Sequence, residues 1–422
     1  MRKLFLTLSL ILLAAWAFAD FPGSGSPISD GMGFPTSRIS DYGGFPGSPI
    51  VASWQNYGLM FYAPFDDPAS PLKLIRGTGT LSFTRAHDAT HTATYVHPGT
   101  GLVTVASADQ LRIEAAGALI EGARTNIILR SQQFDNTDVW AFWGAASVTA
   151  GIVSPAGDNT AFQLDMPNAN TGIHASVSTT AATYAASIWI RADSAGTIRF
   201  FNGAGGGFDN TINVTTIWQR YSTVAAEDGV NGQFGIYRNI AGQLSRVYIW
   251  GAQWEVAAFA SSDLPSTTAE VTRNVDVLTA QTSGNIDNVD GTLALQWTPR
   301  FASTDNVVTA TLFDAGGIRA TYTSADRKIN LTDGTNTVSS AALTFSANVA
   351  QKLAFRWGPS GLLVYRDGTE AATGATYTAG AINANIYIGT DTSSANSAYS
   401  NIKSLRIWNY EMPAANMGVI TQ

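Results

Sequence analysis

The segment 389–399 places three side chains together that could bind a sugar. Asp391, Asn396 and Tyr399 lie between two apolar, strand-like runs, so a loop must present them. A tyrosine ring can stack on the apolar face of a sugar, and a carboxylate or an amide can hydrogen-bond to its hydroxyl groups. We therefore expect Asp391, Asn396 and Tyr399 to bind a glycan. The alternative is a solvated loop without a ligand.

Three of the four histidines, His87, His91 and His97, lie close together and could suggest a metal site. On a continuous strand, however, residues four apart are separated by ~13 Å. A single ion needs all of its ligands at ~2 Å, so only a sharp turn could bring these residues onto one ion. We interpret them as polar residues on a solvated strand face and expect no metal site.

The candidate catalytic motifs lack the geometry that their chemistry needs. Ser400 and Lys403 match the S-x-x-K nucleophile pattern, but positions three apart on a strand face opposite sides. The glycine run at 203–207 precedes no helix start that could hold a phosphate. The acidic pairs at 66–67 and 227–228 are adjacent residues in turn-like segments, whereas glycoside hydrolysis needs two carboxylates ~5–9.5 Å apart. We expect a protein without enzymatic activity, and a glycoside hydrolase is the less favoured alternative.

The composition is that of an extracellular β-protein. Only 13% of the 422 residues are charged, against roughly 25% in ordinary soluble domains. The net charge is −7, and no Lys/Arg run is present to neutralise phosphates, which argues against nucleic acid as a partner. The chain has no cysteine, so disulfides and thiolate metal sites are excluded.

The first 58 residues differ in character from the rest of the chain. Two basic residues precede an apolar run at 4–18 and an A-x-A-like site at 17–19, which predicts a secretory signal peptide over residues 1–19. Residues 20–58 are rich in Gly, Pro and Ser and repeat the FPGS and SPI sequences. Because this composition disfavours helix and strand alike, we expect a linker or an extended arm.

From residue 59 onward the pattern is that of short β-strands separated by turns. We expect an all-β protein with two antiparallel β-sandwich (jelly-roll) domains, preceded by a small β region and the Gly/Pro-rich arm. The predicted boundaries are 59–125 for the small β region, 126–268 for the first sandwich and 269–422 for the second. Five tryptophans fall within strand alternation and are expected in the core: Trp189, Trp218, Trp250, Trp357 and Trp408.

Several segments resemble one protein family. The sequence GALIEGARTNIIL at 117–129 resembles the LLIEEARTNLLLYSEDF junction of many phage virion proteins, especially those of tail tips and fibres. Upstream, FTRA at 83–86 and ATYV at 93–96 resemble the family's F-x-R-A-S-x-A-T-Y-V-D segment, with His97 where an acidic residue is usual. Downstream, WGAQWE at 250–255 and VTRNVD at 271–276 resemble its closing segment. The resemblance implies a structural protein of a phage particle or tail.

Two further resemblances concern the domains. The segment INVTTIWQRY at 212–221 is similar to a step of jelly-roll carbohydrate-binding modules. LLVYRDG at 362–368, IYIG at 386–389 and IKSLRIW at 402–408 resemble laminin-G-like, concanavalin-A-like lectin sandwiches. The Trp-His step usual in these lectin domains is replaced by Gln351 and Lys352, so the family's ligand and metal positions near it do not carry over. A structural calcium ion would suit such a module, but no matched motif supports one, and we expect no cofactor.

Together these features predict a non-enzymatic, phage-type virion or tail-associated protein that binds surface glycans through its β-sandwich modules. The expected partners are a cell-surface polysaccharide and other virion or surface proteins, and homo-oligomers are common among such fibres. The location would be extracellular, on a particle or after secretion. The alternative is a secreted bacterial adhesin or lectin, which the predicted signal peptide favours.

Overall fold

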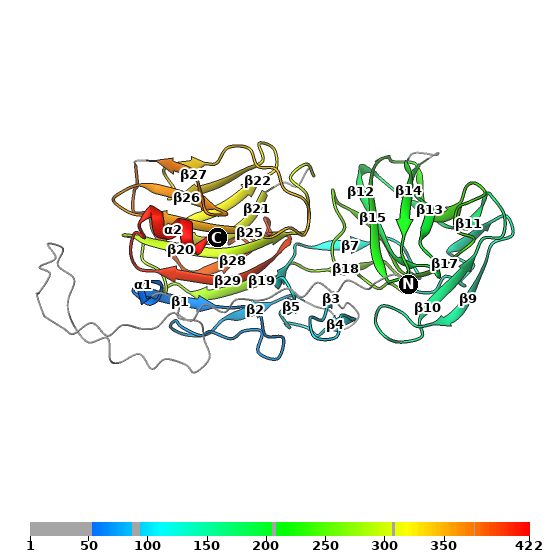
Figure 1. The fold of residues 1–422 in the computed structure, drawn as a ribbon, viewed down its shortest axis with the longest axis horizontal. Helices are drawn as coiled ribbons and strands as arrows, with labels where there is room; N and C mark the ends of the chain where they lie inside the picture. Colours follow the sequence, from blue (N-terminus) through cyan, green and yellow to red (C-terminus); the bar gives the residue numbers. More distant parts are fainter. Residues whose placement is uncertain (1–52, 87–92, 205–207, 306–308, 375) are drawn as a thin grey trace, which may run out of the picture. The chain divides into compact units, whose positions relative to one another are not determined.

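The computed structural model describes residues 53–86, 93–204, 208–305, 309–374 and 376–422 (Figure 1). Nearly all regular structure in this part is β-strand, and the helices are α1 (Ser53–Asn56) and α2 (Ala414–Ile420). Every strand pairing is antiparallel. The prediction of an all-β fold with antiparallel sandwiches is confirmed. None of the described helices is long and apolar enough to cross a membrane.

The predicted signal peptide and most of the predicted arm fall outside the described residues. Only the last six positions of the arm are described, and four of them form α1. This short helix is tied to the body of the fold, because the indole nitrogen of Trp408 donates to the main-chain oxygen of Gln55 at 2.8 Å.

Two sheets build the sandwich that contains the C-terminus, which we call the C-terminal sandwich. Its eight-stranded sheet has the order β27 (Thr369–Gly374), β26 (Leu362–Arg366), β25 (Gln351–Trp357), β20 (Gly291–Pro299), β29 (Ser400–Trp408), β6 (Gly117–Ile120) and β5 (Arg112–Glu114), with β1 (Leu59–Ala63) also paired to β29. Its seven-stranded sheet has the order β2 (Ser82–Thr84), β19 (Val277–Gln281), β28 (Ile382–Ile388), β21 (Thr309–Gly316), β22 (Arg319–Thr323), β23 (Lys328–Thr332) and β24 (Thr337–Ser339). Side chains from both sheets form one buried apolar cluster.

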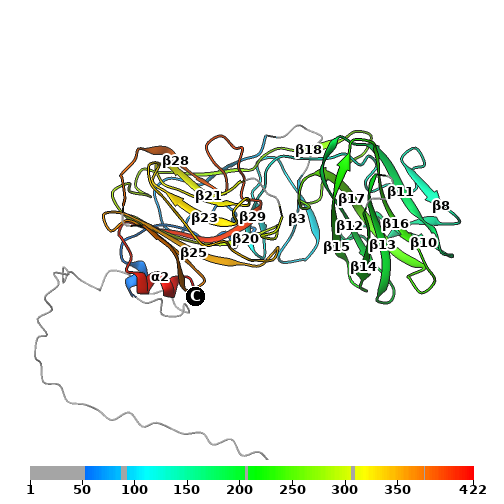
Figure 2. The ribbon, with the colours of Figure 1, turned by 90° about the horizontal axis from the view of Figure 1, so that it is seen from above.

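Two five-stranded sheets build the second sandwich, which we call the jelly-roll sandwich (Figure 2). The β12 sheet has the order β15 (Gln219–Asp228), β12 (Ala181–Arg191), β17 (Arg246–Val256), β10 (Ala161–Asp165) and β9 (Ser147–Ile152). The β13 sheet has the order β14 (Phe208–Val214), β13 (Gly196–Ala204), β16 (Asn231–Arg238), β11 (Thr171–Ser178) and β8 (Trp140–Trp143). Their facing side chains share one core, so the remaining face of each sheet points outward.

The region 59–125 is not the separate small β region that the sequence predicted. Its strands β1, β5 and β6 join the eight-stranded sheet, and β2 pairs with β19 in the seven-stranded sheet (Figure 1). Among the described residues of this region, the hairpin of β3 (Ala93–Val96) and β4 (Val103–Ala106) forms a separate two-stranded sheet. The jelly-roll sandwich is therefore an insertion into the C-terminal sandwich. Alternation along a strand reports which faces are buried, but not which distant strand will pair with it.

A two-stranded stem leads into and out of the insertion. Strand β7 (Arg124–Asn126) pairs with β18 (Val271–Arg273), so Arg124 faces Arg273 across the stem. Both strands come from segments that carry the phage-type sequence resemblance. The stem is therefore the place where the two widely separated motif segments meet.

The tryptophans expected in the core divide into three groups. Trp357 lies in the core of the C-terminal sandwich, as the alternation predicted, whereas Trp250 and Trp408 are buried in smaller apolar clusters outside the two main cores. Trp189 and Trp218 are only partly buried and pack beside Trp250 on the outward face of the β12 sheet. In a two-sheet sandwich an alternating strand has only one face in the core, so half of the apolar positions can lie on the other side.

Candidate functional site

The predicted binding residues Asp391, Asn396 and Tyr399 do not form one exposed cluster. Asp391 is buried, and its carboxylate accepts hydrogen bonds within its own loop from the Ser393 hydroxyl (2.9 Å), the Ala395 amide (3.0 Å) and the Asn396 side chain (2.6 Å). Burial alone would raise the pKa of Asp391, but the hydrogen bonds from Asn396 and Ser393 outweigh it and lower that pKa. The carboxylate therefore holds the loop in shape, and its binding to a glycan stays a prediction.

Tyr399 faces the stem. Its phenol oxygen lies 2.9 Å from Nη1 of Arg124, and the Arg124 guanidinium lies 4.4 Å from the centre of its ring. The backbone of Tyr399 is left-handed, with φ of 44°, which is a costly conformation for an aromatic residue. A side chain on Gly122 would lie 2.1 Å from the phenol oxygen. Gly122 of the family motif therefore leaves space for the phenol group of Tyr399, and Arg124 contacts it.

The other predicted chemistry is distributed as follows. Ser400 and Lys403 lie in β29, as expected for a strand. The pair at 227–228, expected in a turn, lies instead at the end of β15, with Glu227 buried and Asp228 exposed. His87 and His91 lie outside the described residues, whereas Nδ1 of His97 accepts a hydrogen bond from the Gly99 amide. Within the described residues, no group of three His, Cys, Asp or Glu side chains is arranged to hold a metal ion.

The charged residues of the motif segments form a buried ionic cluster. Arg112 contacts the carboxylates of both Glu121 (2.8 Å) and Asp276. Arg273 lies 3.3 Å from Glu121, and Arg85 lies 3.2 Å from Asp276. All five side chains are at most 1% exposed. We call these five residues the junction cluster.

The linker after the jelly-roll sandwich is bonded to these carboxylates. The amide and hydroxyl of Ser262 donate to Glu121 at 2.9 and 2.7 Å. The amide and hydroxyl of Ser261 donate to Glu255 at 2.6 and 2.7 Å. Asn126 is also fully used, because its side chain donates to two main-chain oxygens and accepts from two amides. Buried polar groups are stabilising only when satisfied in this way.

The junction cluster is not suited to acid–base chemistry. Burial raises the pKa of Glu121, but the neighbouring Arg273 and Arg112 outweigh it and hold that pKa far below its usual range. A carboxylate that stays ionised and buried cannot exchange protons with a substrate near neutral pH. The motif segments therefore build the connection between the two sandwiches.

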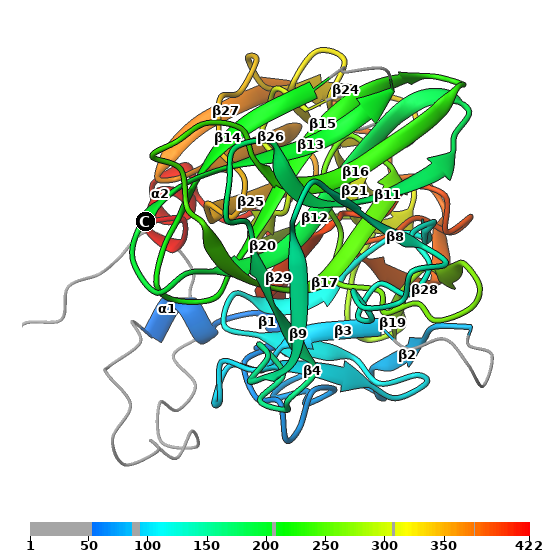
Figure 3. The ribbon, with the colours of Figure 1, turned by 90° about the vertical axis from the view of Figure 1, so that its right-hand side faces the viewer.

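Four rings gather on the outward face of the β13 sheet, and we call them the aromatic face. Trp143 of β8 stacks on His174 of β11 with ring centres 4.2 Å apart and planes 10° apart. Trp143 also meets Tyr237 of β16 edge-on at 5.4 Å and Phe201 of β13 edge-on at 6.1 Å. Trp143, His174 and Tyr237 are partly exposed, so the cluster is available to a ligand. Strands β8, β11 and β16 are neighbours in Figure 3.

Glycines make room for this packing. Gly172 lies between Trp143 and Tyr237 across the strands, and Gly235 lies opposite His174. A side chain on Gly172 would begin 2.3 Å from Cβ of Tyr237, and one on Gly235 would begin 3.0 Å from Cβ of His174. Because these glycines have no side chain, the rings can pack against the backbone and against one another.

His174 is kept neutral within the aromatic face. Burial lowers its pKa, and among the described residues its Nδ1 atom is buried without a hydrogen-bond partner. A neutral imidazole that stacks on Trp143 adds aromatic surface without adding charge at neutral pH.

The aromatic face was not predicted from the sequence, although the sequence carries a signal for it. Phe200 and Phe201 are adjacent in one strand, and Ile236 and Tyr237 are adjacent in another. Successive strand residues face opposite sides, so one member of each apolar pair had to lie on the outer face. The convergence of those outward rings depends on strand order, which the sequence does not display.

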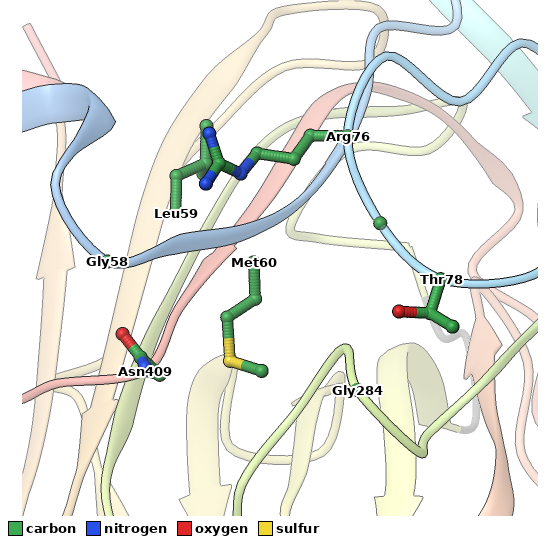
Figure 4. A pocket seen from close by; sticks show the side chains of 8 residues that line it. Gly58, Leu59, Met60, Arg76, Thr78, Gly284 and Asn409 are labelled. Atoms are coloured by element: carbon green, nitrogen blue, oxygen red, sulfur yellow. The ribbon is translucent and has the colours of Figure 1, made fainter. Parts of the chain in front are cut away.

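Two hollows lie apart from the aromatic face and the junction cluster. One, of about 370 Å³, lies where β1 passes the 76–78 loop (Figure 4), and it is lined by Gly58, Leu59, Met60, Arg76, Gly77, Thr78, Gly284 and Asn409. Side chains on its three glycines would clash with Asn409, Asn285 and Thr78. All three glycines also have a positive φ, so close packing and backbone conformation together account for them. The second, of about 350 Å³, lies at the end of the β12 sheet.

Comparisons with known proteins identify no family. No protein-family model matches the chain, and no curated protein matches it.

Solved structures match about a third of the chain at low similarity. A CBM40 module of the Ruminococcus gnavus IT-sialidase, bound to α2,3-sialyllactose, is 16% identical with a TM-score of 0.25, covering 32% of this chain and 83% of the module. A SAP-like pentraxin from Limulus polyphemus is 11% identical with a TM-score of 0.25, covering 32% of this chain and 70% of the pentraxin. Trypanosoma rangeli sialidase in complex with DANA is 11% identical with a TM-score of 0.28, covering 35% of this chain and 26% of the sialidase.

Proposed function

We propose that this chain is a non-enzymatic, extracellular glycan-binding protein of the phage-tail type. In this proposal the jelly-roll sandwich binds the sugar and the C-terminal sandwich carries it on the larger assembly. The observation that supports the glycan site is the aromatic face, where Trp143, His174 and Tyr237 are partly exposed on a solvent-facing sheet.

The chemistry of this face suits a sugar. Sugars present C–H groups on one side of the ring, and these pack against aromatic surfaces, while their hydroxyl groups need polar partners at the edge. Arg199 of β13 is the cross-strand neighbour of Tyr237 and places a positive charge beside the rings, with its Nη1 atom donating to the Thr211 hydroxyl at 2.9 Å. Because the rings stand on paired strands, the platform is held in place before the ligand arrives, which reduces the entropy lost on binding.

The virion assignment is supported by where the motif residues meet. The segments that resemble the phage family supply the stem and four of the five residues of the junction cluster. The fifth, Arg112, lies just before the longest matching segment. The motif residues form the junction between the two sandwiches and are not part of the aromatic face. Proteins that share this junction could therefore differ in the glycans that they bind. Multivalent display on a particle would strengthen weak single-site binding by 10²–10⁴.

The test is glycan binding by the full chain and by a Trp143→Ala/Tyr237→Ala variant, measured on immobilised cell-surface polysaccharides. We expect at least about a tenfold loss for the variant, or ~1.4 kcal/mol. The control is Tyr57→Ala, which removes a ring that is 61% exposed but lies outside the aromatic face. Equal binding by the double variant and the control, with both folded by circular dichroism, would remove the aromatic face as the site.

A second candidate is a secreted bacterial adhesin or lectin that uses the same surface. The apolar run at 4–18 with its predicted cleavage site favours export. Mass spectrometry of the native protein separates the two candidates. A mature N-terminus at Asp20 in an exported fraction supports the adhesin, whereas co-purification with particles supports the virion protein. Release of reducing ends from any bound polysaccharide would argue instead for a glycoside hydrolase.

A further inference from the structure

A second cluster of rings and charge lies on the outward face of the other sheet of the jelly-roll sandwich. Arg191, the last residue of β12, pairs with Tyr248 of β17, and its guanidinium lies 4.0 Å from the centre of the Tyr248 ring. On its other side, Trp218 immediately precedes β15, and its ring centre lies 5.3 Å from the guanidinium. Arg191 is thus held in place between two aromatic side chains.

The N–H donors of Arg191 have no hydrogen-bond partner in the part of the chain that the structure describes. Within the described residues, no hydrogen bond or ion pair engages its guanidinium, and the side chain is partly exposed. By contrast, the nearby Arg246 is paired through Nε with Asp165 at 2.7 Å. A guanidinium that is fixed by stacking and keeps its N–H groups free is ready to bind a planar anion, because its fork of donors matches the two oxygens of a carboxylate.

The hollow of about 350 Å³ is linked to this arginine through Tyr248, whose ring contacts the guanidinium and whose hydroxyl donates to a residue of the lining. It is lined by Asp165, Asp193, Ser194, Leu244, Ser245 and Arg246. Asp165 is neutralised by Arg246, and Asp193 accepts a hydrogen bond from the Tyr248 hydroxyl at 2.9 Å. The second carboxylate oxygen of Asp193 can then accept a hydrogen bond from a ligand. The hydroxyl groups of Ser194 and Ser245 can donate hydrogen bonds to a ligand or accept them from it. A bare anion would be repelled by Asp193, whereas a ligand that also carries hydroxyl donors would be bound by it.

We propose that Arg191, Trp218 and Tyr248 form a second ligand site, for a carboxylate-bearing sugar unit of an acidic glycan. The sugar carboxylate binds the Arg191 fork, and its hydroxyl groups bind Asp193 and the serines of the hollow. The two sheets of the sandwich share one core, so this site and the aromatic face lie on opposite outer faces. The jelly-roll sandwich can therefore hold two glycan segments at once, and the second site does not depend on the first.

The test compares acidic oligosaccharides with their carboxyl-reduced forms by calorimetry on the full chain. The panel contains oligogalacturonate, alginate, hyaluronan oligomers and sialyllactose, and reduction replaces only the carboxylate by a hydroxymethyl group. We expect at least one acidic ligand to bind about tenfold more tightly than its reduced form. Absence of such a preference across the panel would overturn the proposal.

Variants assign the preference to this site. Arg191→Gln should abolish the preference for the acidic form, and Arg191→Lys should recover only part of it, because an ammonium lacks the bidentate fork. Tyr57→Ala, which removes an exposed ring outside both proposed sites, should leave the preference unchanged. An unchanged preference in Arg191→Gln, with the variant folded by circular dichroism, would overturn the site. The Trp143→Ala/Tyr237→Ala variant tests the aromatic face alone, and Arg191→Gln tests the second site alone. A negative result for one site therefore does not decide the other.

Discussion

Nη1 of Arg124 lies 2.9 Å from the phenol oxygen of Tyr399, although the two residues are 275 positions apart in the chain. The contact joins the stem of the inserted jelly-roll sandwich to the loop before β29 of the C-terminal sandwich. The Phe259 ring also packs edge-on against Tyr399 at 5.3 Å, so contacts from two sides offset the cost of the left-handed backbone at this tyrosine. Tyr399 therefore supports the junction.

Tyr399→Phe should destabilise the protein modestly while leaving glycan binding unchanged. The substitution keeps the ring and removes only the hydrogen bond with Arg124, whose net contribution is ~0.5–1.5 kcal/mol. Tyr399→Ala should cost more, since the ring contacts are lost as well. Thermal unfolding and glycan binding measured on the same samples check this. Loss of binding in Tyr399→Phe at unchanged stability would instead support the ligand role predicted for Asp391, Asn396 and Tyr399.

Glu121→Gln should be strongly destabilising. The substitution leaves Arg112 and Arg273 buried without their shared carboxylate, and breaking a buried ion pair costs ~3–5 kcal/mol. The matched control is Asp326→Asn, which removes the exposed pair with Lys328 and should cost no more than ~1 kcal/mol. Denaturant unfolding of both variants gives the comparison. Similar costs for the two would mean that the junction cluster does not hold the fold together.

Asp263 should make the protein more stable in mild acid than above neutrality. Burial raises the pKa of its carboxyl from 3.8 to about 6, although Arg220 opposes this rise. Neither carboxylate oxygen has a hydrogen-bond partner among the described residues. The folded state therefore binds the proton more tightly than the unfolded state, and this group's contribution to stability falls as the pH rises from about 4 to 6. The full effect corresponds to roughly 3 kcal/mol.

Asp263→Asn should remove this pH dependence and raise stability at pH 8, because the variant never carries the buried charge. Unfolding measured from pH 4 to pH 8 for the wild type and the variant checks it. Parallel curves for the two proteins would contradict the prediction. Asp391 should show the opposite pH dependence. Its hydrogen bonds lower its pKa, so its contribution to the stability of the wild type is lost as the pH falls, and Asp391→Asn should remove that loss.

Glycan binding at the aromatic face should be insensitive to pH between 7 and 8 and should change in acid. Burial lowers the pKa of His174, so the imidazole becomes charged only below its ordinary range, when a cation would stand next to the stacked Trp143 ring. His174→Phe should keep the stacking surface and abolish the change. Binding profiles of the wild type and the variant that change alike in acid would show that another group is responsible.

The sequence by itself determined the all-β class, the positions of most strands and the segments that define the junction. Strand alternation and turn residues are local, and they identified β25, β26 and β29 directly. The motif segments were also visible in order along the chain. Their role was not, because Arg85, Glu121 and Asp276 come together only when strands far apart in sequence are placed side by side.

The tertiary structure alone decided which strands share a sheet and which rings share a face. Strand β1 pairs with β29 across more than three hundred residues, and no periodicity within either strand specifies that partner. Likewise, Trp143 and Phe201 each show an outward position in their own strand, but only the order of β8, β11, β16 and β13 brings their rings within 6.1 Å. Local patterns determine which way a side chain faces, whereas strand order determines what it meets.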